Sequence, residues 1–308
     1  SKPVDSASEG EKVELIMNQT PFYGESGGQI GDSGVAWNEV ARLNISNSTK
    51  PIPDLTIHHA TITQGLIKKL DTLTLKVDPE SRSETAIHHS VTHLLQAALK
   101  EVLGEHVKQA GSLVTAQRLR FDYTHFSPLV LGEKNRIEER VNQKIRENLK
   151  VSTNELSIEK AIKDGAVALF GEKYGENVRV VSMGDFSKEL CGGTHTAATG
   201  NIGLFKIISE GGIASGVRRI EAVAGKSAYY SMQEENKTLI SIRSLLKVSP
   251  EEEINRLKKI LEKSREMEKE ISRLKEKLIS GKGSDSDHDV EKIGKISLLV
   301  KQFEEMEA

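Results

Sequence analysis

Cysteine, tryptophan and long apolar runs are scarce in this chain of 308 residues. It has one cysteine and one tryptophan, and aromatic residues make up 4% of it. A single cysteine excludes an intrachain disulfide. Together with the lack of an export signal, it favours a reducing compartment, so we expect a cytoplasmic protein. No run of about 18 apolar residues occurs, so the sequence predicts no transmembrane helix and no membrane partner.

Net charge is also nearly absent, because 43 basic residues stand against 45 acidic ones and the formal net charge is −2. This balance gives the whole chain no general attraction for a polyanion. Any nucleic acid would therefore have to bind through local basic patches. Arg218 and Arg219 are one candidate: on a strand they point to opposite faces, and one of them could meet a phosphate. Exposed arginines without a special role fit the pattern equally well.

Short apolar runs alternate with turn-forming residues through residues 1–80, the pattern of antiparallel strands joined by turns. The expected strands cover residues 13–17, 35–37, 40–45, 55–62 and 73–77. Their spacing predicts a small antiparallel β-barrel. The stretch GESGGQIGDSG at residues 24–34 has five glycines but lacks the Gly-Lys-Ser/Thr of a phosphate-binding loop. Without further context it is a hairpin connection that needs positive φ angles.

The pattern changes at residue 81, where an α+β region over residues 81–225 is expected. Ser81 and Glu84 fit a capping box at the start of a helix that Gly104 would end. Further helices and strands follow without regular βαβ alternation. The expected helices cover residues 137–149 and 158–169, and the expected strands cover residues 111–114, 119–122, 178–181, 203–209 and 217–223.

Residues 226–280 are predicted to be a helical, coiled-coil segment. Ser249 and Glu252 fit a second capping box with Pro250 at the first helical position. Apolar residues then recur by threes and fours with one polar break, at Leu257, Ile260, Ser264, Met267, Ile271, Leu274 and Leu278. Such a heptad seam docks on its own protein or pairs with a partner helix, so a helix-mediated oligomer of a full-length protein is a further expectation. GKGSDSDHD begins a linker, and residues 281–308 would hold it and the start of a truncated C-terminal region.

The single cysteine and three histidines have the pattern of a metal site. His89 and His93 are four residues apart, so on a helix both imidazoles project from one face. Cys191 and His195 lie in CGGTH, where the glycines let the backbone wrap around an ion. A set of three imidazoles and one thiolate suits one tetrahedral zinc ion.

Other interpretations of the same residues explain less. A metalloprotease helix would place Glu after the first histidine, where this chain has Ser90. A Cys191 nucleophile with a histidine base would leave the helical pair unexplained. His88 would need Thr92 as its partner four residues on, and Thr92 is a poor ligand. His58 and its neighbour His59 point to opposite faces of an expected strand, so these histidines are expected to be structural or solvent-facing.

Seven stretches, in order from about residue 13 to residue 225, resemble the editing region of alanyl-tRNA synthetase. They are FYGESGGQIGDSG, HHSVTHLLQAAL, VKQAGSLV, LRFDYTHF, ALFGEKYG, VRVVSMGDFSKELCGGTH and TGNIGLFKIISEGGIASGVRRIEAVAG. The helical seam resembles the segment that leads to the C-terminal oligomerisation domain of that enzyme. The resemblance implies an excised portion without the class II aminoacylation domain, or alternatively a free-standing editing relative that acts in trans.

The resemblance also implies an activity, the hydrolysis of tRNA(Ala) wrongly esterified with serine or glycine. The family's zinc motif falls on the four expected ligands, and its substrate-handling and pocket-lining positions fall on Gln109 and Thr92. Its glycine-rich motif falls on residues 24–34, which makes Gly27, Gly28 and Asp32 candidates for substrate binding.

Alanine differs from serine by one hydroxyl and from glycine by one methyl group, and binding alone separates such pairs poorly. A hydrolytic site could use Thr92 or Gln109 to pair with the serine hydroxyl, since a buried unpaired polar group costs about 1–3 kcal/mol. No carboxylate base is evident beside the ligands, so the general base and the role of zinc, catalytic or structural, stay open. A non-catalytic, zinc-stabilised tRNA-binding module and a threonyl-type editing domain are the other hypotheses.

Overall fold

The computed structural model describes residues 2–168, 175–279, 290–294 and 296–299. The chain divides into two compact units, Ser1–Glu234 and Glu235–Ala308, which are treated separately below. The expected linker over residues 281–289, residues 300–308 of the expected C-terminal region, and most of the motif ALFGEKYG lie outside the described residues. The predicted division into four parts is not tested by this arrangement and stays a prediction.

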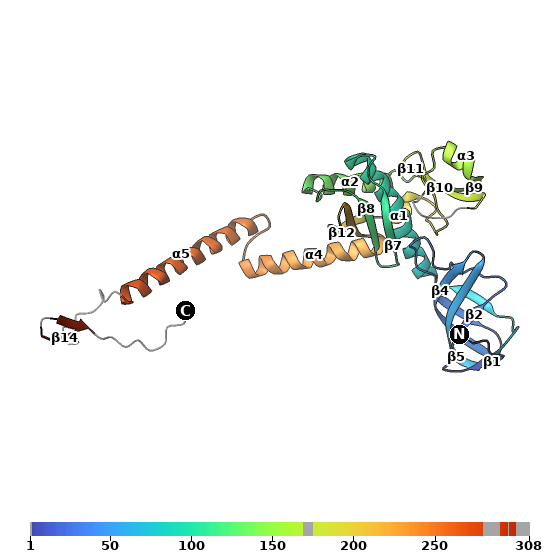
Figure 1. The fold of residues 1–308 in the computed structure, drawn as a ribbon, viewed down its shortest axis with the longest axis horizontal. Helices are drawn as coiled ribbons and strands as arrows, with labels where there is room; N and C mark the ends of the chain where they lie inside the picture. The colour runs from blue at the N-terminus through green and yellow to red at the C-terminus, as the bar shows by residue number, and fades with distance from the viewer. Residues whose placement is uncertain (1, 169–174, 280–289, 295, 300–308) are drawn as a thin grey trace. The chain divides into compact units, whose positions relative to one another are not determined.

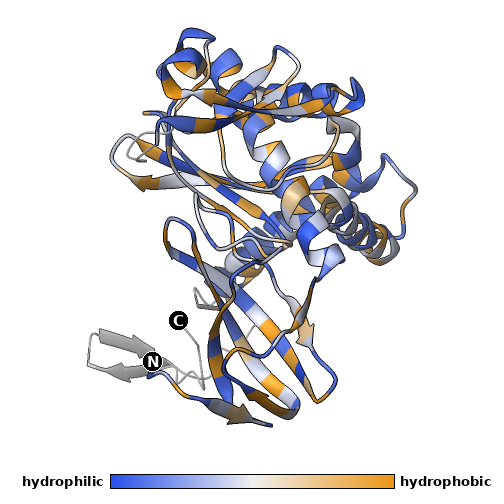
Figure 2. Cartoon of the chain, turned by 90° about the vertical axis from the view of Figure 1, so that its right-hand side faces the viewer, coloured by the Kyte–Doolittle hydropathy of each residue, from blue (hydrophilic) through white to orange (hydrophobic). Residues whose placement is uncertain are grey.

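The first unit begins with an antiparallel sheet of six strands, in the order β1-β5-β4-β3-β6, with β2 also paired to β5. The strands are β1 (Ser6–Ser8), β2 (Lys12–Ile16), β3 (Gly34–Trp37), β4 (Ala41–Ile52), β5 (Leu55–Lys68) and β6 (Thr74–Val77). Alternate residues of β4 are buried, among them Leu43 and Ile45, and they pack with Ile62 of β5 in a separate small core. Figure 2 shows the resulting alternation of hydrophilic and hydrophobic residues along the strands.

The predicted antiparallel strands of residues 1–80 are confirmed, but the predicted barrel is wrong, because the sheet does not close. β1 pairs with the C-terminal end of β5 and β2 with its N-terminal half, so two short strands share one edge of one long strand. β6 forms the opposite edge, and no described strand joins it to β1 or β2. Closure would need such a pairing across the gap.

Two helices cover one face of a second antiparallel sheet (Figure 1). The sheet has the order β12-β13-β8-β7, with β7 (Gln109–Val114), β8 (Leu119–Thr124), β12 (Phe205–Ala214) and β13 (Val217–Ala224). The helices are α1 (Pro79–Leu103) and α2 (Leu131–Arg146). Leu95 of α1, Ile137 of α2 and Phe121 of β8 are fully buried in the shared core. The α+β prediction for this region is therefore confirmed.

A third sheet positions the loop that carries Cys191. Its order is β11-β10-β9, with β9 (Val151–Ser157), β10 (Asn177–Met183) and β11 (Ser187–Leu190). α3 (Ile158–Lys163) follows β9, and a single 3₁₀ turn, η1 (Thr199–Ile202), follows the loop. Cys191 comes directly after β11 and packs at the border of the large core.

α1 begins earlier than its sequence pattern predicts. Asp78 is the N-cap: its carboxylate accepts hydrogen bonds from the backbone N–H groups of Glu80 and Ser81, and Pro79 occupies the first turn. The predicted capping box at Ser81 is therefore wrong. An aspartate followed by proline is the stronger start signal, since proline lacks the N–H that would otherwise be unpaired. The predicted end at Gly104 is confirmed, and this glycine has a φ angle of 114°.

The second unit contains the predicted long helix. α4 (Gly225–Leu246) begins in the first unit and ends in the second, and the long helix α5 (Glu253–Ile279) follows after a turn. The predicted box at Ser249 is wrong in position: the Glu252 side chain accepts from Ser249 within the turn, and the helix starts at Glu253. Leu257, Met267 and the other apolar seam residues of α5 are exposed, so the helix is confirmed while the coiled coil and the oligomer stay predictions.

The described part of the second unit ends in a hairpin, β14 (Val290–Ile293) and β15 (Ile296–Leu299). Among the helices that the structure describes, none is both long and apolar enough to cross a membrane.

Replacing the α1 cap tests the corrected helix start. We expect Asp78→Ala to lower the free energy of unfolding by about 1 kcal/mol, because two N–H groups of the first turn lose their acceptor. Asp78→Asn keeps an acceptor oxygen and should lose clearly less. Urea unfolding followed by circular dichroism measures both changes, and equal losses in the two variants would contradict the cap.

Candidate metal centre

The four expected ligands come together at one point. His89 and His93 lie one turn apart on α1, and Cys191 and His195 lie in the loop between β11 and η1. One donor atom from each of the four lies within 4.8 Å of all the others. The Cys191 Sγ atom is 3.3 Å from Nε2 of His89 and 3.3 Å from Nε2 of His195.

Each imidazole of the cluster has a partner for its Nδ1 atom outside the cluster. Nδ1 of His89 is 2.6 Å from Oε1 of Gln29, and Nδ1 of His93 is 2.8 Å from a carboxylate oxygen of Glu189. Nδ1 of His195 is 3.3 Å from the Ser90 hydroxyl. Such outer partners fix the orientation of a metal-binding ring, and here they leave the Nε2 atoms for the centre of the cluster.

The residues present fit a metal ion. Nε2 of His93 is buried and has no hydrogen-bond partner among the described residues. A buried polar atom without a partner is uncommon and points to an unseen binding partner such as a water or an ion. Three imidazole nitrogens and one thiolate form a donor set typical of tetrahedral zinc, so the cluster of His89, His93, Cys191 and His195 can hold such an ion.

The electrostatics of the cluster favour the deprotonated forms of Cys191 and His195. Burial opposes ionisation of the Cys191 thiol, but the charge of His89 and hydrogen bonds from His195 and His89 outweigh it and lower the pKa of Cys191 far below its usual range. Burial and the charge of His89 lower the pKa of His195 to about 3, so this imidazole is neutral at pH 7. A thiolate and a neutral imidazole are the forms that bind metals.

His93 behaves differently because of its carboxylate partner. Burial acts to lower the pKa of His93, but the charge and hydrogen bond of Glu189 together with the nearby Cys191 thiolate outweigh it and raise the pKa to about 10. The metal-free ring therefore carries two protons at pH 7. Binding of a metal would displace the Nε2 proton, while Glu189 can keep the Nδ1 proton in place.

A cavity of about 260 Å³ adjoins the cluster. His89, His93 and Cys191 form part of its wall. Of the other residues predicted for the site, Thr92, Gln109 and Gly27 also line it. The Thr92 hydroxyl donates to the His88 carbonyl oxygen at 2.7 Å, and Nε2 of Gln109 donates to the Ser112 hydroxyl at 3.2 Å.

Four predicted substrate-binding residues do not line this cavity, and their role stays a prediction. Gly28, with a φ angle of 80°, packs against β7, where an added Cβ would lie 2.5 Å from the Ser112 carbonyl oxygen. Asp32 is buried and pairs with Arg82, whose Nε donates to its carboxylate at 2.8 Å. Arg218 pairs with Glu210, and Arg219 forms two hydrogen bonds with Asp122 at 2.7 and 2.8 Å.

The histidines expected to be structural have structural partners. His88 is buried, with Nδ1 on the Glu84 carbonyl oxygen and Nε2 accepting from the Ala224 N–H. His58 lies between the Thr20 hydroxyl and the Leu15 carbonyl oxygen in the N-terminal sheet.

Several residues at the site have no clear signal in the sequence. Glu189 is a carboxylate beside the expected ligands that the sequence does not single out: it is 4% exposed and lines the cavity. Arg179 holds the CGGTH loop in place: its Nη1 donates to the carbonyl oxygens of Cys191 and Gly193, at 3.0 and 2.5 Å. Gly193 must lack a side chain, since a Cβ there would lie 2.0 Å from a ring carbon of His89.

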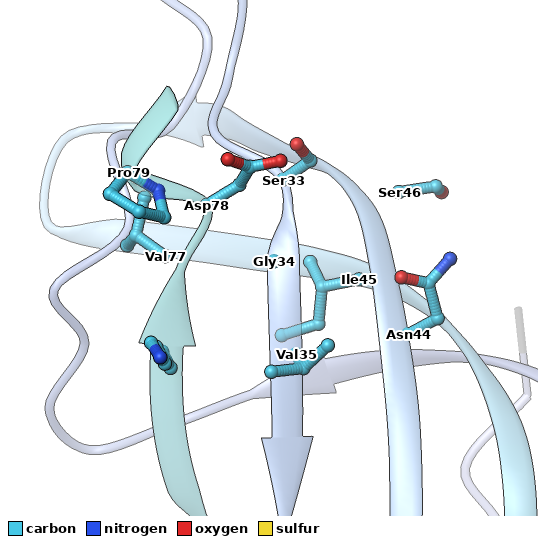
Figure 3. Close-up of a pocket in the computed structure, with 10 residues that line it drawn as sticks. Ser33, Gly34, Val35, Asn44, Ile45, Ser46, Val77, Asp78 and Pro79 are labelled. Atoms are coloured by element: carbon cyan, nitrogen blue, oxygen red, sulfur yellow. The ribbon is translucent and has the colours of Figure 1, made fainter. Parts of the chain in front are cut away.

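A second, more open pocket of about 410 Å³ lies in the N-terminal sheet (Figure 3). It is lined by Ser33, Gly34, Val35, Asn44, Ile45, Ser46, Lys76, Val77, Asp78 and Pro79. None of these residues is a candidate ligand. Asp78 is already engaged as the cap of α1, and its N–H donates to the Ser33 carbonyl oxygen.

Two family models match the chain. Residues 178–221, which include Cys191 and His195, match the threonyl and alanyl tRNA synthetase second additional domain. Residues 1–81 match the class II (A) tRNA synthetases. The donor cluster thus lies in a chain that carries class II tRNA synthetase sequence and the additional domain found in two such enzymes.

Curated relatives narrow the class to one enzyme family. The chain is 44% identical over 307 residues to the alanine–tRNA ligase of Stenotrophomonas maltophilia, and 45% identical over 305 residues to that of Alkaliphilus oremlandii. It is 48% identical over 275 residues to that of Desulfosudis oleivorans. These matches cover 100%, 99% and 89% of this chain and 35%, 34% and 31% of the relatives, so the chain spans about a third of their length. It belongs to the alanyl-tRNA synthetase family.

Zinc binding tests the cluster directly. We expect one zinc ion per chain, and we expect Cys191→Ser and His93→Ala to weaken binding by at least the roughly 10- to 100-fold that loss of an outer partner costs. Competition with a chromophoric chelator measures the affinity. His106→Ala is the matched control, because this exposed imidazole lies outside the cluster, 2.9 Å from His125. Equal zinc affinity in the wild type and in His93→Ala would contradict the site.

Proposed function

We propose that this chain hydrolyses tRNA(Ala) that is wrongly esterified with serine or glycine, and that one zinc ion bound by His89, His93, Cys191 and His195 belongs to the site. The observation that carries the proposal is the four-donor cluster, with two buried and two partly buried residues and an unpaired Nε2 on His93, beside a cavity of about 260 Å³. The match of residues 178–221 to the additional domain of threonyl and alanyl enzymes supports it.

The cavity wall offers acceptors for a serine hydroxyl. Because the Thr92 hydroxyl donates its proton to the His88 carbonyl oxygen, its own oxygen keeps lone pairs for an incoming O–H. Gln109 donates through Nε2 to Ser112, so its carbonyl oxygen is a second acceptor. A serine ester satisfies such acceptors. The methyl group of alanine would leave one of them buried and unpaired, at a cost of about 1–3 kcal/mol.

Glycine is accepted for a different reason. It has no side-chain atom at the place of alanine's methyl group, so that place remains free for a water molecule. A water with two or more polar partners replaces the lost hydrogen bonds at little cost. The same two acceptors therefore reject alanine and admit both serine and glycine.

The chain's own residues hold the site in shape. Glu189 holds the Nδ1 proton of His93, and its other oxygen lies 3.3 Å from the Ser187 hydroxyl, so both carboxylate oxygens are occupied. Arg179 fixes the loop that carries Cys191. Zinc held by all four ligands would have a filled tetrahedral shell, so it would supply Lewis-acid chemistry next to the cavity only with a fifth coordination position or after release of one ligand. The relatives are named for joining alanine to tRNA, and the proposed activity removes wrong products of that reaction from tRNA(Ala), the expected partner.

Deacylation of charged tRNA tests the activity. We expect the chain to release serine and glycine from tRNA(Ala) and to leave Ala-tRNA(Ala) largely intact. A chelator, Cys191→Ser or His93→Ala should each reduce the rate toward the uncatalysed background, while His106→Ala should not. Release of labelled amino acid measures the rate. Salt-dependent tRNA binding without any turnover would contradict the activity and favour a non-catalytic module.

Removing the Thr92 hydroxyl tests how alanine is rejected. Thr92→Val keeps the shape of the side chain but deletes one acceptor of the cavity wall. We expect the preference for Ser-tRNA(Ala) over Ala-tRNA(Ala) to fall roughly tenfold or more, the size expected for one buried polar contact. Comparison of kcat/KM for the two substrates measures the preference. An unchanged ratio would show that Thr92 does not discriminate.

A further inference from the structure

We propose that Gln29 is a positioning residue that fixes the tautomer of His89 and so links the glycine-rich loop of the N-terminal sheet to the metal centre. The inference rests on the metal site of the proposed function, but it does not depend on hydrolysis. It concerns a residue that touches no reacting atom and acts through one of the ligands.

Gln29 is completely buried and joins three distant parts of the chain. Its Oε1 atom lies 2.6 Å from Nδ1 of His89, which is 60 residues away in the sequence. The same oxygen accepts from the Thr194 N–H at 2.9 Å, and Nε2 of Gln29 donates to the Thr194 hydroxyl at 3.0 Å. Every hydrogen bond of this amide thus goes to a ligand or to the residue directly before the ligand His195.

These bonds leave one arrangement of protons on His89. The Thr194 N–H can only donate, so the atom of Gln29 that faces it must be the carbonyl oxygen. A carbonyl oxygen can only accept, so the nearby Nδ1 atom of His89 must carry a proton. The lone pair of a neutral His89 ring then lies on Nε2, the atom that is 3.3 Å from the Cys191 sulfur.

The backbone around Gln29 holds its side chain in place. Gly27 and Gly28 have φ angles of 56° and 80°, which close a tight turn in which the Gln29 N–H donates to the Ser26 carbonyl oxygen at 3.0 Å. Two further backbone bonds join this loop to Val114 at the end of β7. Gly193 completes the fit, because a Cβ there would lie 2.8 Å from Oε1 of Gln29.

Gln29 could have a purely structural role, in which it holds the glycine-rich loop against the CGGTH loop. The experiment must distinguish this role from the positioning of His89. Gln29→Met keeps the size of the side chain but removes its acceptor, so His89 can move its proton to Nε2. Gln29→Glu keeps an acceptor for His89 and for the Thr194 N–H, and the Thr194 hydroxyl can rotate to donate to its second oxygen. Ser48→Ala is the matched structural control: Ser48 is fully buried beside the same loop and bonds to the Asp32 carbonyl oxygen, but it contacts no ligand.

The experiment measures zinc affinity by chelator competition, and the tautomer of His89 in the metal-free protein by nitrogen-15 NMR of the ring. We expect Gln29→Met to weaken zinc binding roughly 10- to 100-fold and to shift the ring proton from Nδ1 toward Nε2. Gln29→Glu should rescue both, and Ser48→Ala should lower thermal stability without changing either. If Gln29→Met does not fold, Gln29→Asn serves instead, because it is polar but too short to reach His89.

Two results would overturn the inference: wild-type zinc affinity and tautomer in Gln29→Met, or a loss in Gln29→Glu as large as that in Gln29→Met. Failure of the wild-type protein to bind zinc would instead refute the metal centre of the proposed function. The tautomer measurement, made without metal, would then still decide the role of Gln29. Tight zinc binding without deacylation would refute the proposed activity alone.

Discussion

The buried Nε2 atom of His93 needs a binding partner, and the donor cluster of the first unit is arranged around this requirement. Left unpaired, a buried polar nitrogen costs about 1–3 kcal/mol, so a partner bound there would stabilise the fold by a similar amount. The atom lies in a cluster with donors from His89, Cys191 and His195, and each imidazole is held from behind by a partner from another part of the chain. The helix α1, the loop after β11 and the glycine-rich loop of the N-terminal sheet all converge on this point.

The four donor residues of the cluster could be found from the sequence because each pair lies close together along the chain. Helical periodicity alone puts His89 and His93 on one face of α1, and CGGTH joins its two donors by a short glycine turn. The outer partners Gln29 and Glu189 could not be predicted from the sequence, because only tertiary packing brings them next to the histidines. Nothing local distinguishes Glu189 from a solvated carboxylate, although it is buried against His93.

The errors in the fold have a similar physical origin. Strand periodicity in residues 1–80 predicts antiparallel strands but not whether their sheet closes, which depends on β1 and β2 sharing one edge of β5. Near the start of α1 the sequence contains two possible N-terminal signals, Asp78 with Pro79 and the capping box at Ser81. The helix begins at the first of them. The apolar periodicity of α5 was enough to predict a helix. It does not identify what covers the exposed apolar seam, because that depends on association with another segment or chain.

The proposed function depends most on the binding of one zinc ion by the four donors of the cluster, next to the cavity that Thr92 and Gln109 line. X-ray absorption at the zinc edge tests this binding directly on the zinc-loaded protein. We expect one sulfur neighbour at about 2.3 Å and three nitrogen neighbours at about 2.0–2.1 Å. A first shell without sulfur, or one made mainly of oxygen, would contradict binding by these four donors.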